Sequence, residues 1–271
     1  MAILLAQCAG RSFMIKDIFV RLITKPDADR VVKKLHYSGK VTSNSQINFG
    51  VFHNNVLLGA AQFGPSIDKR RMGQSLGIGM NESLELNRLA IDDKLGKNAE
   101  SRVLGICLRM IKKQYPFIRC IISFADACQC GDGTIYRASN FKLHSFKRND
   151  SLFWIPGYGV IQRLVLSTAR PTPVQREIRK KLGMPTESEQ RLVKALGGEP
   201  IAGYQMKYIY YFDKELEKSH PSIPFDKIPD EVKMYKGTKR TKHDSNASTS
   251  QVEEGGAEPT SALQLQGQDD R

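Results

Sequence analysis

In the first third of the chain, the spacing of apolar residues predicts one strand, one helix and a hairpin. Ile15–Thr24 alternates apolar and polar residues, as a half-buried strand does, and Lys25–Leu35 places its apolar residues on one helical face. Ile47–Phe52 and Val56–Phe63 are apolar runs joined by three polar residues, which predicts a β-hairpin. The glycine-rich, polar segment Ser66–Ser83 is expected to be a long loop.

The middle of the chain predicts strands that alternate with helices. Ser83–Ile91 is expected to be a strand, and residues 98–115 have apolar positions at helical spacing before a proline ends the pattern. Phe117–Phe124 is a continuous run rich in β-branched residues, which is typical of a strand buried on both faces. Gly133–Phe141 is expected to be a short helix, and Ser151–Ile155 a strand. A mixed sheet flanked by helices, and therefore an α/β fold, follows from this order.

The last part of the chain divides into a charged helical stretch, one strand and a polar tail. Pro171–Leu196 is helical in pattern and broken at Gly183, while Met206–Phe212 is strongly strand-like. The tail contains no aromatic residue and cannot bury enough apolar surface to order itself. We therefore expect a catalytic domain over 15–236, with a helical insertion over about 167–205 and a final strand over 206–212, followed by a disordered tail over 237–271.

The chain is basic, with a formal net charge of +13. Residues 237–271 hold four basic and six acidic residues, a net of −2, so the remaining 236 residues carry +15. A basic body favours a polyanionic partner, because clustered cations release counterions from phosphates, although a solvated basic surface is equally compatible with the charge.

The cysteine count fits a reducing compartment, and the hydropathy predicts no membrane span. Its five cysteines are an odd number in a long chain, which favours a cytoplasmic protein over a disulfide framework. No apolar run approaches the length of a membrane span, and the short apolar start lacks the basic residues of a signal peptide, so no membrane partner is expected.

Two segments carry residues suited to chemistry. Lys97–Arg102 opens a helix directly after a strand, where free backbone N–H groups can bind a phosphate and where Asn98 or Ser101 can act as the cap. An ordinary capped helix has the same pattern. In Ser123–Phe141 a buried strand delivers Asp126 at its carboxyl end, where α/β sheets open their ligand crevices.

The wording of four motifs resembles a known family. LHYSGK, ELNRLAIDD, KNAESR and SFADACQCGDGTIYRASNF are similar to motifs of the Mom-type DNA-modification proteins of phages, members of the GCN5-related N-acyltransferase superfamily. The resemblance covers roughly Ile15–Ile155, with KYIYYF as the last strand, and implies an acyltransferase-like fold. Family members convert adenine in DNA to a carbamoylmethylated form that masks phage DNA from host restriction. The resemblance also implies acetyl-CoA as acyl donor and implicates a metal ion, iron.

The resemblance implies roles for six residues of this chain, namely His36, Tyr37, Arg88, Ser101, Asp126 and Tyr136. The residue chemistry adds detail. His36 and Tyr37 can supply a base or metal ligand, Asp126 can ligate the metal or orient a base, and the Tyr136 phenol can protonate a departing thiolate. Each has a structural alternative: surface packing for the His-Tyr pair, a turn cap for the aspartate, and a packed ring for the tyrosine. Cys128 and Cys130 lack the spacing of common zinc pairs and are expected to be turn residues.

Other residues are expected to hold the cofactor and DNA. Arg88, Asn98, Ser101 and Arg102 are the expected cofactor residues, although GKNAES departs from the Q/R-x-x-G-x-G/A pyrophosphate loop of ordinary acyltransferases. A guanidinium in the middle of a strand needs a partner, so Arg88 is expected to pair with Glu85 or an anionic ligand. The expected partner is double-stranded DNA, contacted by Lys69, Arg70 and Arg71, and a homodimer is left open.

Two other functions remain open at this point. An ordinary acetyl-CoA-dependent N-acetyltransferase would keep the fold and act on a small amine or a protein lysine, but a small amine needs no cationic platform. A DNA-binding protein without catalysis is the other alternative. Polar residues gathered at strand ends disfavour it, although no recognition-helix signature decides the matter.

Overall fold

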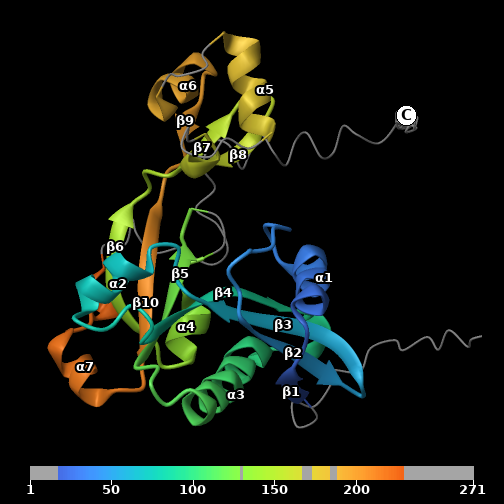
Figure 1. The fold of residues 1–271 in the computed structure, drawn as a ribbon, viewed down its shortest axis with the longest axis vertical. Helices are drawn as coiled ribbons and strands as arrows, with labels where there is room; N and C mark the ends of the chain where they lie inside the picture. The colour runs from blue at the N-terminus through green and yellow to red at the C-terminus, as the bar shows by residue number, and fades with distance from the viewer. Residues whose placement is uncertain (1–17, 129–130, 167–172, 184–187, 229–271) are drawn as a thin grey trace, which may run out of the picture. The chain divides into compact units, whose positions relative to one another are not determined.

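Figure 1 shows the fold in the computed structural model, which describes residues 18–128, 131–166, 173–183 and 188–228. The chain divides into two compact units: unit 1 comprises Met1–Asn149 and Gly203–Gly237, and unit 2 comprises Asp150–Ala202 and Thr238–Arg271. The tail expected over 237–271 lies outside the described residues.

Unit 1 is built on a seven-stranded mixed sheet with the order β1-β2-β3-β4-β5-β10-β6, in which β10 lies between β5 and β6 (Figure 1). The pair β4–β5 is parallel, and the other neighbours are antiparallel. The expected mixed α/β fold is therefore confirmed. The strands are β1 (Ile18–Leu22), β2 (Ile47–His53), β3 (Val56–Gly64), β4 (Ser83–Ile91), β5 (Cys120–Asp126), β6 (Lys142–Arg148) and β10 (Tyr204–Tyr211).

Five α-helices of the described residues belong to unit 1: α1 (Lys25–Leu35), α2 (Lys69–Leu76), α3 (Ala99–Gln114), α4 (Thr134–Ala138) and α7 (Lys214–Ser219). The prediction of a loop over Ser66–Ser83 was wrong, because this segment contains α2. The Asp68 side chain caps α2 by accepting a hydrogen bond from the Arg71 backbone N–H, and Gly77 ends it in the left-handed conformation. Short 3-10 turns occupy Asp93–Leu95 and Phe225–Lys227.

The sheet of unit 1 packs on both faces. On one face, Leu84, Leu86 and Ile121 join the residues of α3 in the larger apolar core. On the other face, Cys120, Ile122, Ile209 and Tyr211 are buried together with Leu76 of α2 and Leu216 of α7. We call the first the α3 face and the second the α2 face. The pairing register assigns the other residues of the sheet to these two faces.

Strand β6 was not predicted from the sequence. Its register against β10 shifts between Lys207 and Tyr208, which pair with Ser145 and Leu143, so His144 is an extra residue in a β-bulge. A bulge breaks the two-residue alternation by which a strand is recognised.

Unit 2 contains a small three-stranded sheet as well as helices. The sheet has the order β8-β7-β9, and its strands are β7 (Leu152–Ile155), β8 (Gly159–Gln162) and β9 (Glu199–Pro200). A 3-10 turn (Arg163–Leu166) and helices α5 (Pro173–Leu182) and α6 (Glu189–Ala195) complete the unit. Unit 2 begins at Asp150 and its first segment ends at Ala202, whereas the sequence analysis expected an insertion over 167–205. The last residues of that range, Tyr204 and Gln205, belong to β10 of unit 1.

Across the described segments, no helix is both long and apolar enough to cross a membrane.

Candidate active site

The two parallel strands β4 and β5 pair at their beginnings and then separate. Their pairing covers Ser83, Leu84 and Glu85 of β4, the last opposite Ile122 of β5. Beyond this point β4 continues along β3, and β5 continues along β10 up to Asp126. Because the carboxyl ends of parallel strands lie at the same edge of a sheet, the opening between these strands is the position where α/β proteins place ligands.

A β-bulge in β4 sets the direction of Arg88. Gln62 of β3 pairs with Arg88 and Phe63 pairs with Leu86, so Asn87 is the extra residue. Without the bulge, alternation from Leu86 would place the Arg88 side chain on the α3 face, in the apolar core. The bulge instead places Arg88 on the α2 face, as bulges do where a side chain must be re-aimed beside a functional site.

Arg88 is held by main-chain oxygens. Its Nε donates to the Lys40 carbonyl at 2.8 Å, and its Nη1 donates to the Asn87 carbonyl at 2.6 Å. The ion pair expected with Glu85 is not formed within the described part of the chain. Burial raises the pKa of Glu85, and Arg88 is among the weaker influences that oppose the rise. The guanidinium therefore keeps an uncompensated charge, which suits an anionic ligand.

His36 is a neutral imidazole at the end of α1. Burial, and next the charge of Arg88, lower the pKa of His36 to about 4. The Ser38 backbone N–H donates to Nδ1 at 3.2 Å, so this nitrogen is an acceptor and the ring proton is on Nε2. His36 is thus built to donate a hydrogen bond through Nε2 in its neutral form. The adjacent Tyr37 ring is 62% exposed, with its centroid 4.4 Å from that of His36.

A buried polar network fixes α1 on the sheet. The fully buried Gln62, directly opposite Arg88 in the register, donates through Nε2 to Asp29 of α1 at 2.8 Å and to Asn48 of β2 at 3.0 Å. Buried side-chain hydrogen bonds that join a helix to a sheet favour one position of the helix. This network explains how the end of α1, and hence His36, keeps its place beside β4.

Asp126 and Tyr136 approach the separated strands from different faces. By its register Asp126 lies on the α2 face at the end of β5, and burial raises the pKa of its carboxyl group, while the hydrogen bond from the Cys128 backbone N–H opposes this rise. Tyr136 comes from α4, packs on Tyr208 and Phe141, and donates its hydroxyl to the Phe124 carbonyl at 3.5 Å. Phe124 lies beyond the last β4–β5 pair, so the phenol reaches the point of separation.

The N-terminus of α3 has no side-chain cap. Asn98 occupies the N-cap in the left-handed conformation with φ 65°, and its side chain makes no capping hydrogen bond. Ser101 donates its hydroxyl to the Asn98 carbonyl at 3.2 Å and caps nothing. Asn98 is therefore the N-cap residue, one of the two that the sequence offered, but neither side chain satisfies a first-turn N–H group. Among the described residues, no side chain caps the first-turn N–H groups, and Arg102 is exposed one turn into the helix.

Lys69, Arg70 and Arg71 form the exposed first turn of α2. The Lys69 ammonium donates to Asn81 Oδ1 at 3.1 Å, and the described residues offer these three cations no salt bridge. Their exposure is compatible with contact to a polyanion, and their role in DNA binding stays a prediction. The helix on which they lie was not predicted from the sequence.

A metal centre does not fit the described residues. They contain no group of three or more His, Cys, Asp or Glu side chains that could hold an ion. His36 Nδ1 already accepts from a backbone N–H, and a metal on Nε2 would require the proton to move to that occupied nitrogen. Of the two turn cysteines, Cys128 is buried and Cys130 lies outside the described residues.

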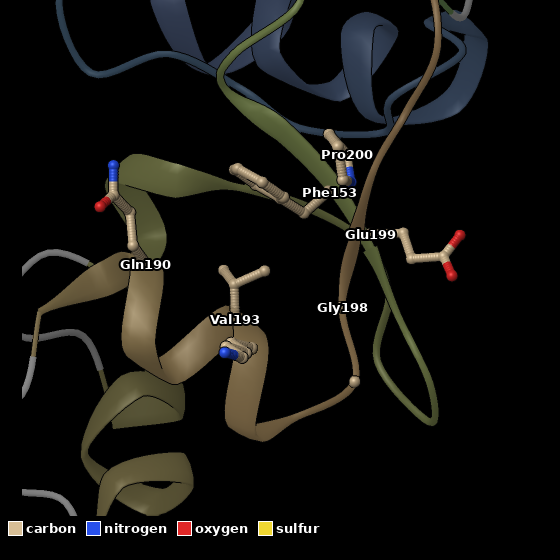
Figure 2. Close-up of a pocket in the computed structure, with 8 residues that line it drawn as sticks. Phe153, Gln190, Val193, Gly198, Glu199 and Pro200 are labelled. Carbon is tan, nitrogen blue, oxygen red and sulfur yellow. The ribbon is translucent and has the colours of Figure 1, made fainter.

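Unit 2 contains an open concavity of about 400 Å³ that none of the candidate residues lines. Figure 2 shows Val193 of α6 pointing toward Phe153 of β7, and the Glu199 side chain pointing away. The walls of this concavity are largely apolar and hold few groups suited to chemistry.

Comparisons with known proteins identify the same family as the sequence motifs. The model of the family described as Mom protein family matches residues 17–229. A curated relative, the "Methylcarbamoylase mom" of Escherichia phage Mu, is 34% identical over 131 residues, which are 46% of this chain and 53% of the relative. The alignment thus spans about half the length of that relative.

Similar solved structures include acetyltransferases. Arabidopsis thaliana NAA60 in complex with acetyl-CoA has a TM-score of 0.42 at 10% identity and covers 72% of this chain and 99% of its own. A GNAT family acetyltransferase from Elizabethkingia anophelis with acetyl-CoA bound has a TM-score of 0.39 at 11% identity and covers 73% and 99%.

Proposed function

Since this chain belongs to the Mom protein family, we propose that it is an enzyme that modifies adenine in double-stranded phage DNA, with acetyl-CoA as the acyl donor. The proposed product is a carbamoylmethylated adenine that protects the DNA from restriction. The observation that carries the proposal is the separation of β4 and β5 between an uncapped helix end and a group of polar side chains. A carbamoylmethyl group contains a nitrogen that an acetyl group lacks, and its methylene carbon is bonded to the adenine nitrogen where the acetyl methyl group has a C–H bond. The reaction therefore also needs a nitrogen donor, which displaces the CoA thiolate, and a two-electron oxidant, which accepts the electrons of that C–H bond.

The donor fits the α3 end of the site. The first-turn N–H groups of α3 and the Arg102 guanidinium would hold the pyrophosphate of CoA, because a helix N-terminus and a nearby cation both favour phosphate. Ser101 and Asn98 shape this turn through their hydrogen bond. When bound, acetyl-CoA supplies an activated two-carbon unit as a thioester.

The acceptor side uses the residues on and beside β5. An adenine amino group must lose a proton as its nitrogen forms a new bond to carbon, and Asp126, whose pKa is raised by burial, is suited to accept it. The thioester sulfur would leave as the nitrogen donor bonds to the carbonyl carbon, and Tyr136, placed at the Phe124 carbonyl, would donate a proton to that sulfur. The neutral His36 donates through Nε2 to an oxygen that gains negative charge, and Arg88 stabilises the same charge from β4.

Iron has no step in this mechanism. The resemblance implicates a metal, but the His36 tautomer and the absence of a third donor among the described residues disfavour the pairing of His36 with Asp126 as ligands.

The test is a nucleoside digest of DNA from cells that express the full chain. We expect an adenine derivative heavier by one carbamoylmethyl group in the mass spectrum, absent from cells that carry the empty vector. A heavier adenine with an acetyl increment would identify an ordinary N-acetylation of DNA. An unaltered digest from cells with verified folded protein would reject the function, and a parallel assay with small amines and lysine peptides would then test the ordinary N-acetyltransferase.

A further inference from the structure

Lys207 and Phe124 stand side by side on the α2 face of the sheet. They are directly opposite each other in the antiparallel pair β10–β5, and such partners have their side chains on the same face with Cβ atoms about 5 Å apart. Ser145 of β6 is opposite Lys207 on the other side. The three residues therefore form a row across β5, β10 and β6, the strands that lie together in Figure 1.

This row lies where the apolar cover of the sheet ends. One pair earlier on the same face, Ile122 and Ile209 are fully buried under α2 and α7. At the next pair on that face the Phe124 side chain is 45% exposed. An exposed aromatic ring on a strand, next to polar neighbours, is a surface on which a flat ligand can stack.

Lys207 is a partly buried cation without a counter-charge. Burial lowers its pKa, and it has no hydrogen bond or ion pair with any described residue. The carboxyl group of Asp126 is one pair further along β5, opposite Gln205, and burial raises its pKa. His144, in the bulge of β6, has its pKa lowered to about 4 by burial and next by Lys207, so it adds no charge near neutral pH.

Across the separated strands, Arg88 on β4 lies on the same face and also lacks an ion pair with described residues. A cation without a carboxylate partner, directly beside an exposed aromatic ring, matches a ligand that has both phosphate and a flat base. DNA and the nucleotide part of CoA share this chemistry. The open helix end that suits CoA phosphate belongs to α3, which packs on the opposite face, so the α2 face is left for DNA.

We propose that Lys207 and Phe124 hold one extrahelical nucleotide of the DNA substrate, with a backbone phosphate on the Lys207 ammonium and the base stacked on the Phe124 ring. The inference rests on the proposed function and adds that the adenine leaves the duplex before it reacts. A base inside a stacked duplex presents only its edges, so it can lie flat on a ring of the sheet only after it has been unstacked. Asp126, two residues beyond Phe124 on the same face of β5, is then beside the base.

The experiment measures DNA binding by the full chain. Two duplexes are used, identical except that one contains a single adenine without a pairing partner. We expect the wild-type protein to bind the second duplex roughly tenfold more tightly or better, because less unpairing energy is needed. Lys207→Met should weaken binding to both duplexes and reduce the slope of log K against log salt by about one, as expected for one lost phosphate contact. Phe124→Leu should remove the preference for the unpaired adenine and keep the salt slope.

Three controls make the result decisive. Lys207→Arg keeps the charge and should restore the salt slope. Lys113→Gln removes an exposed lysine of α3 and should change neither quantity. Acetyl-CoA affinity, measured without DNA, should stay at the wild-type value in Lys207→Met and Phe124→Leu. A loss of acetyl-CoA affinity with unchanged DNA binding would assign both residues to the cofactor and overturn the proposal.

The proposal and the proposed function fail in different ways. If the digest contains the modified adenine but both variants bind the two duplexes as the wild type does, the nucleotide site is wrong and the function stands. If folded wild-type protein neither binds DNA nor modifies it, the function fails, and the nucleotide site fails with it.

Discussion

The backbone N–H of Ser38 donates to Nδ1 of His36, and this one contact decides what the histidine can do. With the pKa lowered to about 4, the ring is neutral at neutral pH and carries its proton on Nε2. A neutral imidazole of this tautomer offers a hydrogen bond rather than a lone pair to the substrate side. The sequence suggested a base or a metal ligand, and the geometry favours a donor.

His36→Gln should retain more activity than His36→Asn. The glutamine amide can place an N–H donor near the position of Nε2, whereas the asparagine reproduces only the acceptor at Nδ1. Initial rates of adenine modification, with expression and folding matched, provide the measurement. Equal and complete loss in both variants, together with a wild-type rate that a chelator abolishes and added metal restores, would contradict the donor role.

Stability should fall as the pH is lowered from about 6.5 toward 4, and His36 should contribute to the fall. In this window an unfolded histidine binds a proton, while the folded His36, with its pKa of about 4, does not. The unfolded state then binds more protons, so the free energy of unfolding decreases as the pH falls. His144 has the same direction of shift, mainly through burial. Urea denaturation at several pH values should give a flatter dependence for His36→Gln than for the wild type.

Arg102→Gln should weaken acetyl-CoA binding, because its guanidinium lies one turn into the uncapped helix α3. Loss of one charge-assisted contact is worth about 1.5–3 kcal/mol, or roughly tenfold or more in affinity. Isothermal titration calorimetry without DNA measures the affinity of each variant for acetyl-CoA. Arg109→Gln, on an exposed position further along the same helix, is the matched control, and a similar loss in that variant would assign the effect to general charge.

Replacing Lys69, Arg70 and Arg71 by glutamine should weaken DNA binding more at low salt than at high salt. The three side chains are exposed in α2, so their contribution is mainly long-range attraction to phosphate, which salt screens. Fluorescence anisotropy across a salt series would show a shallower dependence for the triple variant. An unchanged slope would place the DNA contacts elsewhere. Because the side chains of these residues do not make the α2 cap, the fold should be kept.

Regular elements could be predicted from the sequence, and the irregular ones that shape the site could not. The bounds Lys25–Leu35 and Ser83–Ile91 agree with the structure because periodic apolar residues are flanked by clear end signals. The bulge at Asn87 has no sequence signal, and it turns Arg88 to the other face. Alternation alone therefore assigns Arg88 to the wrong side of its strand. Phe124 was predicted to be one more buried residue of an apolar strand. It is half-exposed because α2 and α7 cover only the earlier part of the strand, and neither helix was predicted from the sequence.

The phenol of Tyr136 provides the sharpest test of the mechanism. Its ring packs on Tyr208 and Phe141, with centroids 5.5 and 5.6 Å away, so Tyr136→Phe keeps the packing and removes only the hydroxyl that reaches the Phe124 carbonyl. If this hydroxyl protonates the departing sulfur, the modification rate should fall by roughly a hundred- to ten-thousand-fold, the range of general acid catalysis.

The matched control for Tyr136→Phe is Tyr210→Phe, which removes a hydroxyl from another partly buried ring against Phe141. Thermal unfolding and acetyl-CoA affinity should stay near the wild-type values in both variants. The rate should fall only in Tyr136→Phe, because only this hydroxyl is proposed to protonate the sulfur. A packing role instead predicts that both variants keep their rate. A normal rate in Tyr136→Phe would remove the phenol from the mechanism. The adenine-modification function would survive that result, since it rests on the family match and not on this hydroxyl.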